Sequence, residues 1–275
     1  MKLLFIGDIV GKPGREIIRK GLRGLVEHFD VDLVIANAEN SAAGFGVTKD
    51  IGDTLLEAGV HVMTSGNHIW SKKEAIDYIG TEPRLLRPAN FPASVPGNGS
   101  YLARSADGRT AGIVNVMGRV FMQQLDDPFV AVVREIEALR TRAKVILVDF
   151  HAEATSEKAA MGWYLDGKVT AVIGTHTHVQ TADERILPKG TAFLTDVGMT
   201  GPHDSIIGVE IEPALSRFLN GMPSRFEPAT ANPRLNAVII DADEKTGRAE
   251  DIERLSYSLD ELEQLTNAGP VRSSI

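Results

Sequence analysis

Short apolar runs and longer amphipathic segments alternate along the first eighty residues of the chain. The runs Lys2–Ile6, Val31–Ala36 and Val60–Thr64 are rich in Val, Ile and Leu and are typical of buried strands. The segments between them place apolar residues at helical spacing. The helices expected from this pattern are Arg15–Phe29, Thr48–Ala58 and Ser71–Ile79. A strand–helix alternation of this kind predicts a layered α/β domain.

The rest of the chain adds further strands and one long helix. Asp127–Arg142 has a helical period, and Ala106-Asp107-Gly108 predicts a turn between two strands. The strands expected here are Ser100–Arg104, Thr110–Val116, Lys144–Asp149, Val169–Gly174, Thr191–Thr195, Leu235–Asp241 and Ile252–Ser258. The chain contains no internal repeat, charge block or clear linker. We therefore expect one domain, residues 1–275, in which two sheets are flanked by helices.

Local signals mark where two of these helices begin and end. Thr48 is a good N-cap for the second helix, and Gly59 a good terminator. Ser71 is the expected N-cap of the third helix.

Composition excludes several classes of protein. A net charge of −8 argues against a broad nucleic-acid surface, which needs a basic face. The chain has no cysteine, so disulfides and thiolate chemistry cannot contribute. The apolar run Leu3–Ile6 is too short for a signal peptide or a membrane span, and a cytoplasmic protein is the default expectation.

Groups that bind metals follow several of the expected strands. The segments are Gly7-Asp8, Asn37-Ala38-Glu39-Asn40, Gly66-Asn67-His68, Asp149-Phe150-His151 and Gly174-Thr175-His176-Thr177-His178. The carboxyl ends of parallel strands meet at one edge of a sheet, where α/β proteins gather their functional groups. Their combination therefore predicts a two-metal hydrolytic site.

Each segment also has a simpler interpretation when it is taken alone. Asp8 could cap the next helix, Glu39-Asn40 could form an ordinary loop, and His151 could be an exposed residue at a strand end. His176 and His178 are harder to explain by packing. Residues at i and i+2 of an extended segment face the same side, so both imidazoles can reach one site.

Gly7–Gly14 is not a P-loop. A P-loop has four residues between its glycines and Ser or Thr after its lysine. Here three residues separate Gly7 from Gly11, and Pro13 follows Lys12.

These segments together resemble the calcineurin-like metallophosphoesterases, and most closely their YmdB-type branch. The branch's own signatures are similar to Phe150–Lys158, Gly174–Asp183 and Thr195–Pro202 of this chain. The resemblance covers nearly the whole chain. It implies a four-layer α/β/β/α sandwich of two mixed sheets, with a dinuclear metal centre at the sheet edge.

The resemblance also implies the ligands of each metal. One metal would be held by Asp8, Glu39, Asn40 and His178, and the other by Glu39, Asn67, His151 and His176. Glu39 would bridge the two metals. His68 would lie beside them as the catalytic proton donor or a substrate clamp.

The chain departs from the broad superfamily pattern at three positions. Val10 stands where most relatives have His, and the branch pattern suggests that Asn40 fills the gap. Ile69 replaces an acidic residue after the Asn-His pair, so the partner that orients His68 is not identified. Glu39 would bridge where many relatives use Asp.

The implied activity is hydrolysis of small phosphodiesters, above all 2′,3′-cyclic nucleotides, by a metal-bridging hydroxide. Two cations can hold the nucleophile and the phosphate oxygens, and His68 can protonate the departing alkoxide. A phosphomonoesterase or 5′-nucleotidase with the same metals remains an alternative. So does a metal-binding regulatory protein that acts through a partner.

The mixed nitrogen and oxygen ligands suit two ions of Fe or Mn, with Zn as an alternative. The resemblance also suggests a homo-oligomer. Phe45 or Trp70, next to proposed ligands, could stack a base, although simple packing explains both.

Overall fold

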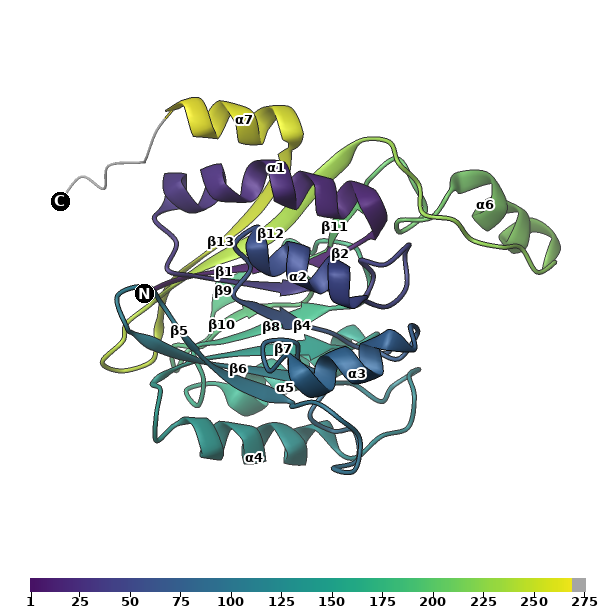
Figure 1. Ribbon diagram of the computed structural model, residues 1–275. Helices are drawn as coiled ribbons and strands as arrows, with labels where there is room; N and C mark the ends of the chain where they lie inside the picture. The colour runs from purple at the N-terminus through teal and green to yellow at the C-terminus, as the bar shows by residue number, and fades with distance from the viewer. Residues whose placement is uncertain (269–275) are drawn as a thin grey trace.

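The computed structural model describes residues 1–268, which form two sheets with helices on both outer faces (Figure 1). The helices are α1 (Gly11–Phe29), α2 (Lys49–Glu57), α3 (Glu74–Thr81), α4 (Pro128–Leu139), α5 (Thr155–Leu165), α6 (Ile211–Asn220) and α7 (Leu259–Ala268). This architecture confirms the predicted α/β class with two mixed sheets.

The first sheet combines parallel and antiparallel strands. Within the described residues its order is β2-β11-β12-β1-β3-β4, and β13 pairs with β12. Its strands are β1 (Lys2–Ile6), β2 (Asp8–Ile9), β3 (Leu33–Asn37), β4 (Val62–Thr64), β11 (Met199–Pro202), β12 (Pro233–Ala242) and β13 (Ala249–Ser258). Because β1, β3 and β4 are parallel, their carboxyl ends lie at one edge.

The second sheet has the order β5-β6-β7-β8-β10-β9 in the same part of the chain. Its strands are β5 (Ser100–Arg104), β6 (Thr110–Met117), β7 (Val145–His151), β8 (Ala171–Thr175), β9 (Arg185–Ile186) and β10 (Ala192–Leu194). The strands from β6 to β10 along this order are parallel, and both edge strands are antiparallel.

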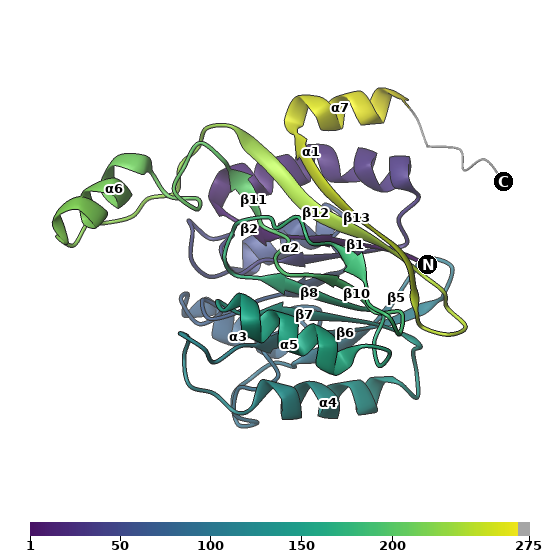
Figure 2. The ribbon, with the colours of Figure 1, turned by 180° about the vertical axis from the view of Figure 1, so that it is seen from behind.

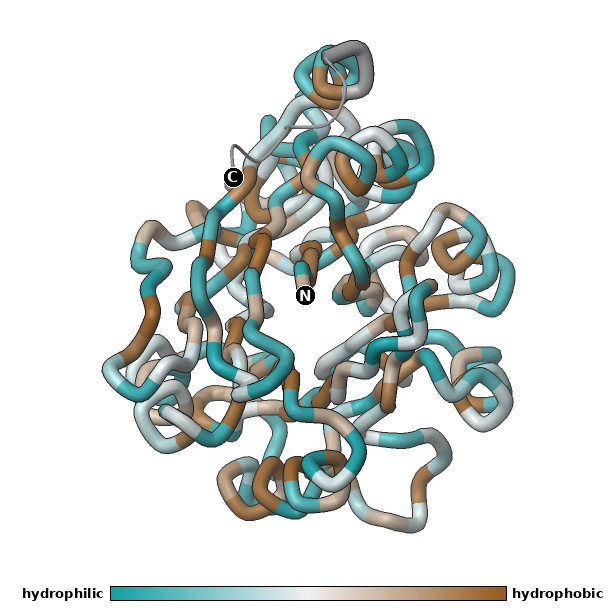
Figure 3. Tube along the Cα trace, turned by 90° about the vertical axis from the view of Figure 1, so that its left-hand side faces the viewer, coloured by the Kyte–Doolittle hydropathy of each residue, from teal (hydrophilic) through white to brown (hydrophobic). Residues whose placement is uncertain are grey.

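Apolar side chains fill the space between each pair of neighbouring layers. Phe5, Ile35 and Leu147 belong to the cluster between the sheets. A second cluster joins the first sheet to α1, α2, α3 and α7, and a third joins the second sheet to α4 and α5. Seen end-on in Figure 3, the helices are brown on part of their circumference and teal on the rest. The order of layers is therefore α/β/β/α, as the family resemblance implied.

Several predicted boundaries were wrong in detail. The first helix begins at Gly11 rather than Arg15, with Pro13 in its first turn, where its missing N–H costs nothing. Thr48 does cap α2, and its hydroxyl accepts from Ile51 N at 3.4 Å. Ser71 does not cap α3, which begins at Glu74 after Lys73 without a side-chain cap.

Helix α6 stands apart from the layers and projects from the body of the molecule in both ribbon views (Figures 1 and 2). We call residues 207–228 the arm. The sequence pattern predicts no element in this segment. No helix in residues 1–268 is long and apolar enough to cross a membrane.

Candidate metal centre

The polar segments predicted from the sequence meet at one edge of the two sheets. Asp8 lies in β2 just beyond β1, Glu39 follows β3, and His151 is the last residue of β7. Asn67 and His68 follow β4, and His176 and His178 follow β8. The parallel strands thus bring together side chains that are far apart in the sequence.

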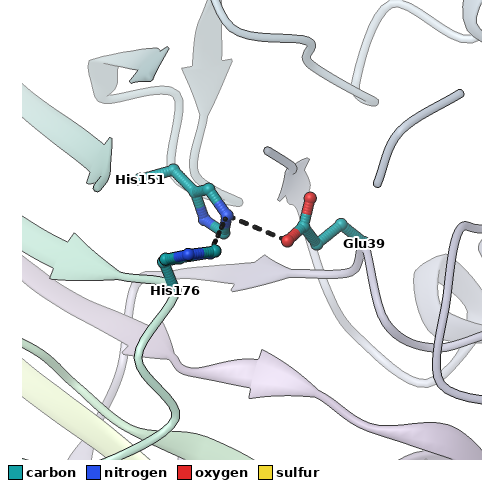
Figure 4. A group of neighbouring side chains, drawn as sticks. All are labelled: Glu39, His151 and His176. Carbon is teal, nitrogen blue, oxygen red and sulfur yellow. Dashed lines mark hydrogen bonds and ion pairs between the residues drawn. The ribbon is translucent and has the colours of Figure 1, made fainter. Parts of the chain in front are cut away.

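His151 Nε2 is the centre of one group of donors. It lies 2.9 Å from Glu39 Oε1 and 3.1 Å from His176 Nδ1 (Figure 4). It also lies 3.0 Å from Asn67 Oδ1. One imidazole N–H cannot satisfy this many neighbours. A cation can, because each of these atoms carries a lone pair. Glu39, His151 and His176 therefore form a candidate metal site.

Asp8 and His178 lie beside the first group, and Asn40 lines the same cavity as His178. Asp8 Oδ1 and Asn40 Oδ1 are buried, and neither has a hydrogen-bond partner in the described part of the chain. His178 Nε2 lies 3.9 Å from Asp8 Oδ1. The Asn40 amide nitrogen donates to the Gly44 carbonyl at 2.9 Å, which leaves Oδ1 free. Burying an oxygen without a partner costs free energy, and a bound cation would give these two oxygens a partner.

A buried relay fixes the ring of His151 from behind. Its Nδ1 lies 2.9 Å from Thr175 Oγ1, and that hydroxyl donates to Asp149 Oδ1 at 2.7 Å. Because the hydroxyl proton points to Asp149, Thr175 accepts from Nδ1–H. This tautomer leaves the Nε2 lone pair directed into the donor group, as a ligating histidine requires.

The other two histidines are oriented by different groups. His178 Nδ1 donates to the Ile207 carbonyl at 2.8 Å, which turns Nε2 toward Asp8. His176 Nε2 lies 3.2 Å from Glu153 Oε2, which turns Nδ1 toward His151. Each imidazole therefore has one nitrogen held by the protein and one directed into the site.

Charges in the donor groups are strongly coupled. Burial disfavours ionisation of Glu39, but attraction and a hydrogen bond from His151 outweigh it and lower the pKa of Glu39. Burial likewise disfavours the His151 imidazolium, but Glu39 and Asp8 raise its pKa. Burial and the charge of His151 lower the pKa of His176 to about 3. Glu39 and Asp8 thus attract positive charge to this position, and a cation bound at Nε2 would supply that charge while the imidazole stays neutral.

Gly66 allows His151 to approach the donor group. A Cβ on Gly66 would lie 2.1 Å from His151 Cδ2, far inside van der Waals contact. Any side chain here would displace the imidazole. The glycine before Asn67-His68 is thus required by packing at the site.

His68 lies beside both donor groups. Its backbone N–H donates to Glu39 Oε2 at 2.8 Å, and its ring packs against Phe45 with 4.8 Å between centres. Ser71 Oγ is 3.5 Å from its Nδ1. Ile69 is fully buried in the core, so Phe45 and Ser71, rather than the next residue, flank His68. Burial lowers the pKa of His68, and the charge of Glu39 partly offsets this.

A cavity of about 510 Å³ opens over these groups. Its lining includes Glu39, His68 and His178, together with Arg217 and Phe226 of the arm. The Arg217 guanidinium lies 5.4 Å from the centre of the Phe226 ring. Phe45 also borders the cavity, whereas Trp70 packs edge-on against Phe91.

Sequence reasoning assigned no role to Asp149, Thr175 and Glu153, nor to the arm residues at the cavity. Asp149 and Thr175 are fully buried polar residues within or at the end of apolar strands. A polar residue in such a run is the one signal that could have identified them. No pattern in the Gly/Pro-rich region distinguishes Arg217 or Phe226.

Comparison with known proteins gives a consistent set of relatives. The sequence profile of the YmdB-like protein family matches residues 4–255. A Bacillus subtilis protein named 2′,3′-cyclic-nucleotide 2′-phosphodiesterase is 47% identical over 95% of this chain and 99% of its own length. A Mycoplasma genitalium protein named putative phosphatase/phosphodiesterase is 37% identical over 97% of this chain and 96% of its own.

Solved structures share the fold. A hypothetical protein from Thermus thermophilus superposes with a TM-score of 0.87 at 44% identity, covering 94% of this chain and 99% of that one. A structure described as a novel phosphatase from Mycoplasma pneumoniae gives a TM-score of 0.87 at 37% identity, with coverage of 94% and 93%.

Proposed function

The chain belongs to the YmdB-like family and is a hydrolase of the phosphodiesterase/phosphatase class, and we propose that it opens 2′,3′-cyclic nucleotides. The observation that carries the proposal is that donor residues line one cavity beside His68, and that two of them, Glu39 and His176, converge on His151. The name of the Bacillus relative supports the choice of substrate and of the 2′ bond.

Two metal ions fit the residues present. Asp8, Asn40 and His178 would hold one ion, Asn67, His151 and His176 the other, and Glu39 would bridge them. The mixed oxygen and nitrogen donors favour Fe or Mn, with Zn as an alternative. When bound, such ions lower the pKa of water toward about 7 to supply the nucleophile, and they offset charge on the phosphate.

Hydrolysis breaks the bond between phosphorus and O2′, forms a bond from phosphorus to the water oxygen, and delivers a proton to O2′. His68 is the proposed donor of that proton. Burial lowers its pKa, whereas an anionic phosphodiester beside the ring would favour the protonated form that the reaction needs. Ser71 and Phe45 hold the ring at the cavity wall.

The aromatic and basic part of the cavity wall suits a nucleoside. Phe45 and Phe226 supply aromatic faces, and Arg217 supplies a positive charge for an anionic ligand. Aromatic side chains stack on any base, so this wall would favour nucleotides without selecting one base.

The first test is the substrate range of Mn- or Fe-loaded protein. We expect 2′,3′-cyclic AMP to be opened to 3′-AMP in preference to 3′,5′-cyclic AMP, an aryl phosphodiester and a phosphomonoester, with products separated by chromatography. Preference for the monoester would instead support a phosphatase or 5′-nucleotidase. No turnover of any substrate with two metals bound would support a regulatory metal-binding protein.

Replacing the bridging carboxylate should remove more metal than replacing a terminal one. We expect Glu39→Ala to lose both ions and Asp8→Ala chiefly one, because only Glu39 contributes to both groups. Elemental analysis of the purified variants gives the metal content per chain. Two metals retained in Glu39→Ala would contradict the bridging role.

His68→Ala should keep its metals and lose turnover. General-acid catalysis is typically worth about 10²–10⁴-fold, so kcat for the cyclic nucleotide should fall by about that factor. His28→Ala is the control, since His28 lies at the far end of α1 and packs on Phe29. Equal kcat for the two variants, each with full metal content, would reject His68 as the acid.

The arm supports the proposal that the chain self-associates. Phe218 is 81% exposed, Leu219 77% and Met222 64%, an apolar surface that water disfavours. We expect a homo-oligomer by light scattering and a smaller species for Phe218→Asp. A monomeric wild-type chain at micromolar concentration would contradict self-association.

A further inference from the structure

The turn that carries His176 and His178 has an unusual backbone. His176 has φ of +100° and His178 has φ of +64°, in the left-handed region that favours glycine. Residues in such conformations persist only where their surroundings fix them. The contacts that fix this turn therefore determine where both imidazoles point.

Thr177, between the two histidines, is held by a single carboxylate. Its backbone N–H donates to Asp196 Oδ2 at 3.1 Å, and its hydroxyl donates to the same oxygen at 2.8 Å. Asp196 Oδ1 accepts from Gly198 N at 2.8 Å. Both oxygens of Asp196 are thus engaged, and Oδ2 is the one that holds the turn.

Asp196 is itself paired with a buried lysine. Lys158 Nζ donates to Asp196 Oδ2 at 2.6 Å, and each side chain is 1% exposed. Lys158 occupies the inward face of α5, together with Met161 and Leu165, where an apolar residue is expected. A buried ion pair is rarely retained for stability, because apolar residues of similar volume often do as well. This suggests a specific positional role.

The pair also joins the elements that carry the candidate ligands. Helix α5 begins a few residues after His151, the His-Thr-His turn follows β8, and Asp196 follows β10. Figure 2 shows α5 against the outer face of the second sheet, to which β7, β8 and β10 belong. Further along, Thr181 N donates to the Asp196 carbonyl at 3.0 Å, so the segment after His178 is tied to the same residue.

We infer that Lys158 and Asp196 form a positioning clamp that, through Thr177, holds His176 and His178 in their ligating geometry. Neither Lys158 nor Asp196 is among the residues that line the cavity, and the hydrogen bonds of Asp196 to Thr177 connect the pair to the turn. The inference rests on the metal centre proposed above. The clamp extends the set of residues that determine metal affinity to Lys158, Asp196 and Thr177, which lie outside the donor groups.

Thr177 allows the clamp to be loosened with little change in volume. Thr177→Val removes the hydroxyl, and we expect the apparent dissociation constant for Mn²⁺ to rise about 10–100-fold, the usual cost of losing a group that orients ligands. Thr177→Ser keeps the hydroxyl and should stay close to wild type. Binding is measured by competition with a chelator, alongside the melting temperature.

Thr191→Val is the matched control. The buried Thr191 hydroxyl donates to the Val169 carbonyl at 2.7 Å, away from the donor groups. It should lower the melting temperature without changing Mn²⁺ affinity. Equal Mn²⁺ affinity in Thr177→Val and Thr191→Val would overturn the clamp.

A second variant tests the ion pair itself. Lys158→Met/Asp196→Asn removes both charges together, so no unpaired charge is left buried. An amide oxygen accepts more weakly than a carboxylate, and we expect a folded protein with about tenfold weaker Mn²⁺ binding. Unchanged affinity in the folded double variant would overturn the role of the pair. If wild-type protein binds no Mn²⁺, the proposed metal centre fails together with the clamp.

Discussion

The structure depends on one constraint: polar donors are buried together at the edge where two sheets meet. Asp8, Glu39, Asn40 and His151 are almost completely shielded from water. Protein hydrogen bonds satisfy only part of this group, since Asp8 Oδ1 and Asn40 Oδ1 have none among the described residues. Burying such groups costs free energy that a folded chain recovers through hydrogen bonds or a partner of opposite charge. The arrangement is thus understandable as a preformed cation site.

The surrounding residues keep this arrangement from relaxing. A donor group of mixed charge would tend to collapse onto its own internal hydrogen bonds. Instead, each imidazole is held from outside, His151 by Thr175, His178 by the Ile207 carbonyl and His176 by Glu153. Gly66 removes the side chain that would otherwise occupy the place of the His151 ring. These supporting residues therefore serve the geometry of the site more than the stability of the fold.

The sequence predicted the layers and the location of the site more reliably than the details around it. Strand ends were recognisable because the apolar runs end shortly before Asp8, Glu39, Asn67 and His151, and the parallel topology then brings those ends together. Helix α5 gave no comparable signal, because its inward face includes Lys158 and Gly162. The short strands β2 and β11 lack the length on which a pattern depends.

Residues that act through others were harder to predict for a physical reason. An aspartate that accepts from a buried Thr, or from a backbone turn, has the same local sequence as a solvated one. Its role depends on contacts across the fold, such as Asp149 with Thr175 or Asp196 with Thr177. The arm residues at the cavity, Arg217 and Phe226, present the same difficulty.

Val10 explains how the site can differ from the broad superfamily. It is 2% exposed and packs against the turn at Gly208, where a Cβ would lie 2.9 Å from its Cγ1. A histidine at position 10 would need the space that this turn fills. The same turn carries the Ile207 carbonyl that orients His178. A valine here thus leaves room for the turn that supports His178, a proposed ligand, and the amide oxygen of Asn40 is the donor that we propose in place of the histidine. On the hard–soft scale of metal ligands, an oxygen in place of a nitrogen makes the proposed donor set harder. A harder donor set favours Mn or Fe over softer metals.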